Sequence, residues 1–305
     1  MKLLYHCPSA EGGLANYGQH QARALAAIGQ GEVLWLGPPE NAPPAGVSAL
    51  EPLTPLPPAP PGRNLPERAR GFLESSVRPY RDLDAAIATH RPDAVVLGAW
   101  SEYFAPFWAP SLRHWRRQGV RFGAMVHDPV RDYVRGPQWW HRWSIREAYS
   151  FVHVAYVHDA TAVDFAGMKT TPTVVEIPHG PCAVPMVAIE KLAARRHLGL
   201  PEAGRVWLAF GHLRDGKQLD VVLEALAQAP ASDHLCVAGR EQSGGQRPAS
   251  YYRELAARLG VADRVSWHIG YIPDDQVALF FVASDVLMLT YSSAFRSASG
   301  VLNVN

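Results

Sequence analysis

The sequence predicts an α/β protein with two Rossmann-like domains, each a doubly wound parallel sheet, the second of them incomplete. Short apolar runs alternate with helical stretches along all 305 residues, the pattern of parallel sheets built from βαβ units. The chain is also longer than one average domain of roughly 100 to 200 residues. The pattern closes near residue 180 and restarts with a new strand at Trp207. We therefore expect an N-terminal domain over residues 1–185 and a partial C-terminal domain over 186–305.

The first domain opens with a strand, a glycine-containing loop and a helix. Runs of β-branched and leucine residues predict its strands, at Lys2–Tyr5, Val33–Leu36, Ala94–Leu97, Phe122–Val126, Val152–Val157 and Val174–Ile177. Tyr17, Leu25 and Ile28 return to one face of the first helix, and a second helix is expected from Glu67 to about His90. The proline-rich segment 37–66 predicts an extended surface loop, because proline donates no backbone hydrogen bond.

The second domain repeats the cycle on a shorter scale. Its predicted strands are Trp207–Phe210, Leu235–Val237, Val265–Ile269 and Val286–Leu289. Leucines and valines spaced i, i+3, i+4, i+7 predict helices around 219–226 and 252–259, and Asp274 is interpreted as the cap of a third. A doubly wound half normally has about six strands. We therefore expect this domain to lack its last strands.

Composition excludes several function classes. The net charge of +1 gives no global attraction to nucleic acid. Three distant cysteines, Cys7, Cys182 and Cys236, support neither a disulfide framework nor a zinc site. No segment approaches the ~18 apolar residues of a membrane span, and no signal peptide precedes the first strand. We expect a soluble protein of the reducing cytoplasm without a metal site.

The stretch FGHLRDGKQLDVVLEALA, at 210–227, combines a strand, a glycine turn, two cations and a helix. Arg214 and Lys217 lie three residues apart across the turn, so both could face a phosphate at the strand end, one as a planar fork and the other as a point charge. A solvated pair of cations at the start of a helix fits the spacing equally well.

A second stretch, LTYSSAFRSASGVLNVN at 289–305, places small and hydroxyl residues before a helix-like turn. Around Ser299, the free N–H groups of Gly300, Val301 and Leu302 could meet an anion. The alternative is an ordinary serine helix cap.

Together these stretches resemble the retaining GT-B glycosyltransferases of group 1, or family 4, over most of the chain. The resemblance is carried, in colinear order, by EGGLANY at 11–17, VHD at 126–128, IPHGP at 177–181, FGHLRDGK at 210–217, AGR at 238–240, GYIPDDQVALFFVASDVLMLTY at 270–291 and SGVLNV at 299–304. The chain departs from the pattern in having Gln218 where glycine is usual, and small or uncharged residues where many relatives carry two glutamates.

The resemblance implies a role for each matching residue. Gly211, Arg214 and Lys217 would bind the diphosphate of a nucleoside diphosphate sugar, and the turn at 299–302 would meet the phosphates or the sugar. His127 would lie beside the reacting sugar as the catalytic candidate. It also implies that Gly12 and Gly13 let the first loop approach donor and acceptor.

These matches imply a retaining, metal-independent glycosyltransferase of polysaccharide or glycolipid synthesis, with no cofactor besides its donor substrate. Preorganised cations and amide dipoles would stabilise the charge that develops on the leaving diphosphate. Its expected partners are a nucleotide sugar and a carbohydrate or glycolipid acceptor, not nucleic acid. A truncated, non-catalytic pseudo-glycosyltransferase that binds a sugar nucleotide or a partner enzyme is the alternative, favoured by the short second domain and the absent glutamates.

Tryptophans interleave with arginines in two places of the first domain. Trp139, Trp140 and Trp143 alternate with arginines, and Trp115 lies within a second basic stretch. Amphipathic rings beside guanidinium groups suit a lipid headgroup surface, which predicts peripheral contact with the inner membrane face. The alternative is that the tryptophans pack in an interdomain wall with the arginines lying over them.

Overall fold

The computed structural model describes residues 1–54, 65–102, 104–127, 137–158, 171–180, 188–242, 245–292 and 300–303, the side chains of 65–70 and 302–303 excepted. The chain forms two compact units, Met1–His179 and Gly180–Asn305. The domain boundary expected at 185/186 falls within 181–187, outside the described residues.

The first unit is built on a parallel sheet of seven strands in the order β3-β2-β1-β4-β5-β6-β7. The strands are β1 (Lys2–His6), β2 (Glu32–Leu36), β3 (Ser48–Ala49), β4 (Ala94–Leu97), β5 (Arg121–Val126), β6 (Val154–Val157) and β7 (Thr173–Glu176). All six predicted strands are confirmed. The additional strand, β3, lies in the proline-rich segment expected to be a loop, where it pairs with β2 at the sheet edge.

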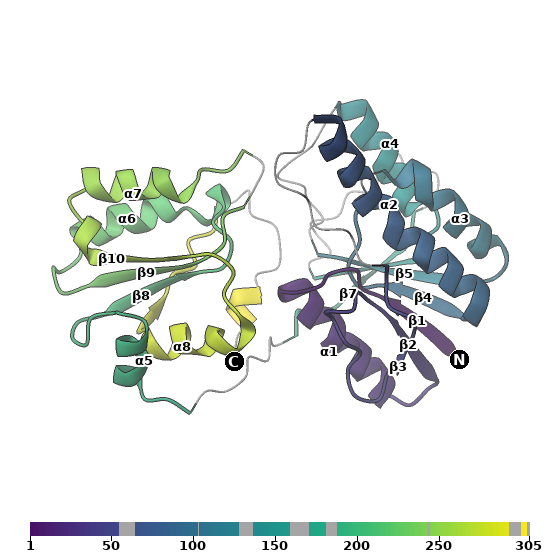
Figure 1. Ribbon diagram of the computed structural model, residues 1–305, viewed down its shortest axis with the longest axis horizontal. Coiled ribbons are helices and arrows are strands. Elements are labelled where there is room, and N and C mark those ends of the chain that lie inside the picture. Colours follow the sequence, from purple (N-terminus) through teal and green to yellow (C-terminus); the bar gives the residue numbers. More distant parts are fainter. Residues whose placement is uncertain are drawn as a thin grey trace. The chain divides into compact units, whose positions relative to one another are not determined.

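Helices cover both faces of this sheet (Figure 1). They are α1 (Gly13–Ala27), α2 (Leu65–His90), α3 (Ala105–Arg117) and α4 (Gln138–Tyr149). Side chains of α2, α3 and α4 share one apolar core with the sheet, and α1 packs into a separate core on the other face. The sequence patterns predicted α1 and α2 but neither α3 nor α4.

The second unit has a parallel sheet in the order β10-β9-β8-β11. Its strands are β8 (Val206–Phe210), β9 (His234–Gly239), β10 (Val265–Ile269) and β11 (Val286–Leu287). All four predicted strands are confirmed, although β11 ends two residues before the predicted Leu289. The order changes direction beside β8, and ligands of such sheets bind outside the carboxyl ends of the strands at that switch point.

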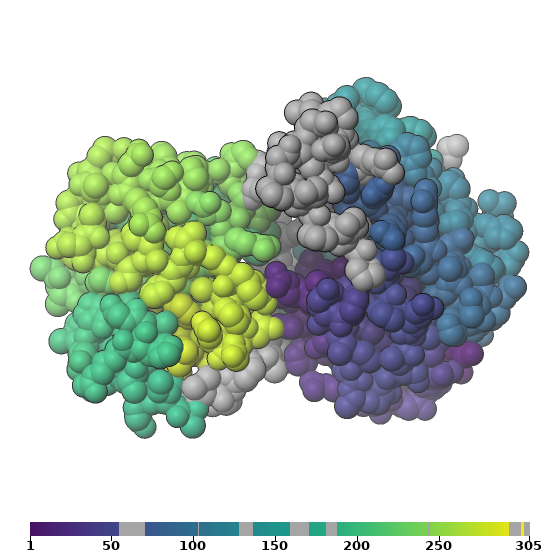
Figure 2. Space-filling model, viewed as in Figure 1, coloured from purple at the N-terminus to yellow at the C-terminus, as the bar shows by residue number. Residues whose placement is uncertain are grey.

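In the described residues of this unit, helices and short 3-10 turns connect the strands. They are α5 (Lys191–His197), α6 (Leu219–Gln228), α7 (Ala249–Arg258), α8 (Asp274–Ala283), η2 (Asp215–Lys217), η3 (Ala262–Arg264) and η4 (Gly300–Asn303). The α6 and α7 helices cover one face of the sheet, and α5 and α8 cover the other (Figure 1). In Figure 2 the teal-green surface of α5 adjoins yellow-green residues of the same unit.

One capping prediction is wrong. Pro273, not Asp274, is the N-cap of α8, and no side chain caps that helix end. Asp274 and Asp275 instead lie in the first turn of α8, where their negative charge complements the helix dipole. Asp285 directly precedes β11, as expected of a strand-start residue.

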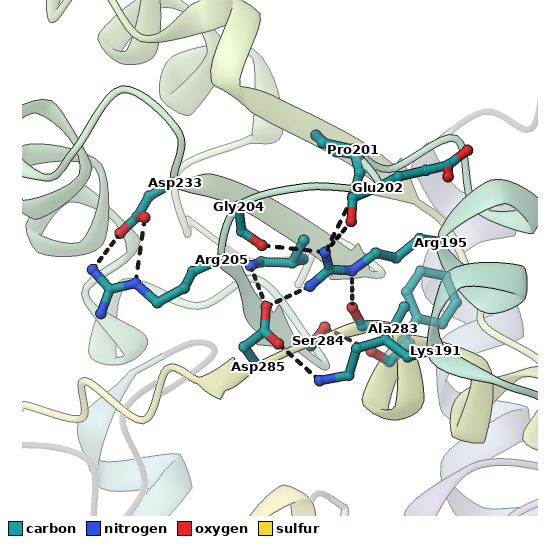
Figure 3. A network of polar contacts seen from close by, with 12 residues as sticks. Lys191, Arg195, Pro201, Glu202, Gly204, Arg205, Asp233, Ala283, Ser284 and Asp285 are labelled. Atoms are coloured by element: carbon teal, nitrogen blue, oxygen red, sulfur yellow. Dashed lines mark hydrogen bonds and ion pairs between the residues drawn. The ribbon is translucent and has the colours of Figure 1, made fainter.

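Arg195 of α5 joins that helix to the sheet (Figure 3). Its side chain is 4% exposed and pairs with Asp285. The guanidinium also donates to the carbonyls of Ala283, Glu202 and Gly204. Asp285 in turn accepts the backbone N–H of Val206 at the start of β8, at 2.7 Å. A buried guanidinium is stable only with such full pairing, so Arg195 fixes α5, β8 and β11 together.

Candidate functional site

An open hollow lies in the second unit at the carboxyl end of β8. Its walls include Phe210, Gly211, Arg214, Lys217 and Tyr252. The structure thus brings together three of the residues predicted to bind a donor phosphate. The position agrees with the general rule that open parallel sheets bind ligands at the carboxyl edge beside the switch point.

The backbone conformation at position 211, in the wall of this hollow, requires glycine. Its φ of +95° belongs to the region that L side chains rarely adopt. A Cβ at this position would lie 2.8 Å from Nζ of Lys217 and 3.5 Å from a methyl carbon of Val301. The glycine therefore leaves room for the lysine and brings η4 close to the end of β8.

Lys217 is half-buried and points back toward the sheet. Its Nζ donates to the carbonyl of Phe210 at 2.8 Å. Burial, and next the charge of Arg214, lower the pKa of Lys217 to about 8. Near neutral pH the hollow therefore holds two adjacent cations whose mutual repulsion an anion would relieve.

No carboxylate neutralises these two cations among the described residues. The acidic residues closest in sequence, Asp215 and Asp220, both pair with Arg247, at 2.9 Å in each case. No ion pair involving Arg214 or Lys217 occurs in the described part of the chain. A partly buried, uncompensated pair of cations is expected where a protein binds an anion.

The turn that carries both cations is held from two sides. On one side, Oδ1 of Asp215 accepts from the backbone and side chain of Arg247 and from the hydroxyl of Tyr252. On the other, Thr290 Oγ1 donates to the Lys217 carbonyl at 2.8 Å, and the N–H of Ser292 donates to the Gly216 carbonyl at 2.9 Å. The bonds at Asp215 outweigh its burial and lower its pKa. The carboxylate is thus a fixed anchor for η2.

The edge of the hollow carries a further titratable group. Burial lowers the pKa of His212, and the charges of Arg214, Arg240 and Lys217 lower it further. The imidazole is therefore neutral at pH 7, so it can donate or accept a hydrogen bond without adding charge.

The second predicted anion turn is only partly described. Ser299 lies outside the described residues, and Gly300, Val301 and Leu302 form the start of η4. A methyl carbon of Val301 and Nζ of Lys217 both lie within 4 Å of the position that a Cβ on Gly211 would occupy. The turn therefore lies next to the cations. The structure thus brings η4 to the predicted phosphate site.

In the first unit, His127 directly follows β5 and lies in a cluster of aromatic rings. Its Nε2 faces the carbonyl of Gly98 at 2.9 Å, and its Nδ1 faces Nε2 of His158 at 3.4 Å. Tyr17 meets the ring of His127 edge-on, with centroids 5.0 Å apart. His179 lies beside His158, at a centroid distance of 4.8 Å. We call these four residues the histidine cluster.

Three members of the histidine cluster were missed as site residues in the sequence. Tyr17 belongs to the predicted apolar face of the first helix, His158 follows the predicted strand that ends at Val157, and His179 lies within the motif IPHGP. The available signal was positional: His127 and His158 each directly follow a predicted parallel strand. The carboxyl ends of parallel strands share one sheet edge, so both side chains could have been expected there.

The two glycines of the first loop differ in their structural roles. Gly12 is the N-cap of α1 with φ +81°, which strongly favours glycine. A Cβ on Gly13 would meet nothing within 4 Å. The open space at Gly13 is compatible with a ligand, whereas Gly12 is explained by the backbone.

The aromatic and basic stretches separate into two environments. Trp115 packs against the core of the first unit and donates to Asp84 at 2.7 Å, so its ring is held within that unit. Trp139 and Trp143 on α4, with Phe107 on α3, are 65%, 43% and 61% exposed. Trp140 contacts all three rings. We call Phe107, Trp139, Trp140 and Trp143 the aromatic patch.

Two negative observations apply to the described residues. They contain no group of three or more His, Cys, Asp or Glu side chains placed to hold a metal ion. Nor does any helix in the described part of the chain have the length and apolar character to cross a bilayer.

Comparison with known proteins finds local sequence similarity to one group of enzymes. No family model matches the chain. A D-inositol 3-phosphate glycosyltransferase of Salinispora tropica is 36% identical over 113 residues, which cover 34% of this chain and 23% of the relative. The enzyme of that name from Mycobacterium tuberculosis is 34% identical over 106 residues. The match therefore spans about a quarter of these relatives' length.

Solved structures show the fold over nearly the whole chain. HepE of Anabaena, solved in complex with UDP-glucose, superposes with a TM-score of 0.61 at 16% identity, covering 94% of this chain and 73% of HepE. WaaG, a glycosyltransferase involved in lipopolysaccharide biosynthesis, gives a TM-score of 0.60 at 16% identity, covering 99% and 77%. The resemblance predicted from the motifs is confirmed: the chain has the GT-B glycosyltransferase fold.

Proposed function

We propose that this GT-B chain is a glycosyltransferase that moves a sugar from a nucleoside diphosphate sugar to an acceptor hydroxyl in polysaccharide or glycolipid assembly. The observation that carries the proposal is the uncompensated pair Arg214 and Lys217 at the carboxyl end of β8. A diphosphate supplies the negative charge that this hollow lacks. The nucleotide-sugar complex of HepE, a protein of the same fold, supports that ligand class.

The second unit would bind the donor and stabilise its leaving group. Breaking the bond between sugar and phosphate leaves new negative charge on the diphosphate, which Arg214 and Lys217 would meet in a preorganised position. A turn fixed by Asp215 needs little rearrangement as that charge develops. We propose that these cations do the work of a metal ion, so that the reaction is metal-independent and needs no cofactor besides the donor.

The first unit would bind the acceptor and present His127 to the sugar. Both ring nitrogens of His127 face groups of the protein itself, so we assign the ring a positioning and polar-contact role beside the sugar. Retention of the anomeric configuration is proposed from the family resemblance alone.

We further propose that the chain works in the cytoplasm and touches the inner membrane face through the aromatic patch. Exposed tryptophans suit the interfacial region of a bilayer, where one part of the ring is apolar and the other hydrated. Co-sedimentation with anionic phospholipid vesicles tests this contact. Trp139→Ala with Trp143→Ala should reduce the bound fraction, and Trp115→Phe serves as the packed control. Equal binding of all forms would contradict it.

The second candidate is a non-catalytic protein that binds a sugar nucleotide or a partner enzyme. It is favoured by the small or uncharged residues that stand where many relatives carry two glutamates. Both candidates use the same phosphate site, so donor binding alone does not separate them.

Turnover separates the two candidates. The chain is incubated with UDP- and GDP-sugars and a panel of sugar and lipid-linked acceptors, while release of free nucleoside diphosphate is measured. We expect release that survives EDTA, with proton NMR showing a product of unchanged anomeric configuration. Lys217→Ala should abolish release, whereas Arg258→Ala, which removes an exposed cation at the end of α7, should not. Binding without release over the whole panel would favour the non-catalytic candidate.

A further inference from the structure

The histidine cluster contains a chain of polar contacts that crosses four neighbouring strands. Gly98, His127, His158 and Ile177 each directly follow one of the strands β4, β5, β6 and β7. In the sheet register Val126 pairs with Val157, which brings the two histidines side by side. From end to end, the contacts are Gly98 O to His127 Nε2 at 2.9 Å, His127 Nδ1 to His158 Nε2 at 3.4 Å, and His158 Nδ1 to Ile177 O at 3.0 Å.

Two neutral imidazole rings carry too few hydrogens to form all three hydrogen bonds of this series of contacts. A carbonyl oxygen only accepts, so each outer ring nitrogen must carry a hydrogen to bond it. Each neutral imidazole carries one hydrogen. With both hydrogens at the outer nitrogens, Nδ1 of His127 and Nε2 of His158 face each other as lone pairs. Moving one hydrogen inward leaves a carbonyl without its bond, so a neutral pair makes at most two of the three bonds.

One added proton completes all three bonds. We propose that His127 and His158 bind a single proton between them, and that His158 is thereby the positioning residue that fixes the ring of His127 at the carboxyl edge of the sheet. The proton comes from solvent and lies between Nδ1 of His127 and Nε2 of His158. A second added proton would give both inner nitrogens a hydrogen and break the bond between the rings.

Some groups around the pair oppose the uptake of a proton, and others favour it. Burial lowers the pKa of His158, the carbonyl of Ile177 raises it, and His179 lowers it. Tyr17 contacts both rings edge-on from α1, and burial raises its own pKa, so its phenol is neutral. Among the described residues, the titratable groups that face the pair are thus Tyr17 and His179, and no carboxylate contributes to the shift of His158. The added hydrogen bond is what favours the shared proton.

Nitrogen-15 NMR of the full chain without donor tests the shared proton directly. Ring nitrogens report their protonation as the pH is lowered from about 8 to about 5, the range in which histidine titrates. We expect the rings of His127 and His158 to titrate together with one midpoint and one proton taken up. In His158→Gln the signals of His127 should change, whereas His153→Asn, at the other end of β6, should leave the pair as it is. Separate midpoints, with His127 unaffected by His158→Gln, would overturn the proposal.

The catalytic consequence rests on the proposed function and has its own readout. The amide of His158→Gln can donate to Nδ1 of His127 at every pH but cannot share a proton. We therefore expect kcat/KM of the native chain to rise as the pH falls through the midpoint of the pair, and that rise to be absent in His158→Gln. His158→Leu cannot share the proton either, so it should also lack that rise. Its kcat/KM should be about tenfold below the native value at pH values under the midpoint, or about 1.4 kcal/mol, with circular dichroism confirming that it folds. Leu and Gln variants that both keep the native pH profile would refute the positioning role. Should the chain transfer no sugar, the NMR titration still decides the shared proton.

Discussion

Lys217 is the residue on which the phosphate site most depends, and its pKa makes that dependence measurable. With a pKa of about 8 in the free chain, the ammonium loses its proton between pH 7 and pH 9. If only the charged form binds a diphosphate, affinity should fall about tenfold over that interval. Lys217→Arg, whose guanidinium stays charged, should remove this slope. Isothermal titration with a nucleotide sugar measures it, and equal slopes for the two proteins would show that Lys217 does not meet the phosphate.

His6 predicts a pH dependence of folding in the first unit. Its ring is fully buried, and burial lowers its pKa from 6.5 to about 4, although the carbonyl of Pro79 opposes this shift. His6 therefore takes up a proton below about pH 6.5 in the unfolded chain, but only below about pH 4 in the folded chain. Stability is fully present above 6.5 and should decline by about 2 kcal/mol between pH 7 and pH 5 through this group.

Urea denaturation of the native chain and of His6→Leu at the two pH values tests this. The variant should lose about 2 kcal/mol less than the native chain on acidification. His114→Leu, which changes an exposed histidine of α3, should behave as the native chain does. The same loss in the His6 variant as in the native chain would show that His6 is not the group responsible.

At the scale of elements, the turn before α6 carries a measurable strain. Gln218 is the N-cap of α6 and has φ +51° and ψ +48°, a left-handed conformation that costs a non-glycine residue about 1 kcal/mol. Glycine is usual at this position in the family that the sequence resembles, and the left-handed backbone conformation explains that preference. Gln218→Gly should raise the free energy of unfolding by up to about 1 kcal/mol.

Glu224→Gly is the matched control, because it introduces glycine on the exposed, right-handed interior of the same helix. It should lower stability by about 1 kcal/mol. Urea denaturation distinguishes the expected increase in the free energy of unfolding from the expected decrease. Destabilisation by both substitutions would mean that the conformation of Gln218 is compensated by contacts of its side chain.

Arg195 predicts a large effect from a residue remote from the phosphate hollow. Arg195→Met removes the buried guanidinium, leaves several carbonyls without their donor and takes one of its two cations from Asp285, which should cost about 3 to 5 kcal/mol. Arg196→Met, which removes an exposed partner of Glu202, should leave the melting temperature nearly unchanged, because solvent screens such a pair. Thermal denaturation of both variants measures this. Similar small losses would contradict the role of Arg195 in fixing α5 to the sheet.

The elements that were predicted correctly are those with a strong local pattern. Strands such as Val95–Leu97 and Val206–Phe210 are apolar on both faces, which a buried parallel strand requires. The two-residue strand β3 has exposed side chains within a proline-rich segment, so no local apolar pattern marks it. The cap at Asp274 was misjudged because Pro273 occupies the N-cap position and leaves Asp274 in the first turn.

At the scale of the whole molecule, the two candidate sites differ in how far sequence could predict them. Gly211, Arg214 and Lys217 lie within seven residues, so one local motif contains the phosphate site. The histidine cluster joins Tyr17 to residues up to His179, and its contacts depend on the register of three adjacent strands. Sequence spacing carries no information about that register. Only the positions of His127 and His158, each directly after a predicted strand, pointed toward the cluster.

The fold of the two units and the cations of the second unit give different kinds of evidence on function. Their fold is that of the GT-B glycosyltransferases. The uncompensated cations of the second unit point to a diphosphate as the ligand of that hollow. The central claim is therefore the donor-phosphate site itself.

Isothermal titration of nucleotide sugars into the native chain and into Lys217→Ala tests that claim most directly. We predict that a UDP- or GDP-sugar binds the native chain and is displaced by inorganic diphosphate. Affinity should be more than about tenfold weaker in Lys217→Ala, or about 1.4 kcal/mol, and unchanged in Arg258→Ala. Absence of binding at millimolar donor, or equal affinity of the native chain and Lys217→Ala, would contradict the account.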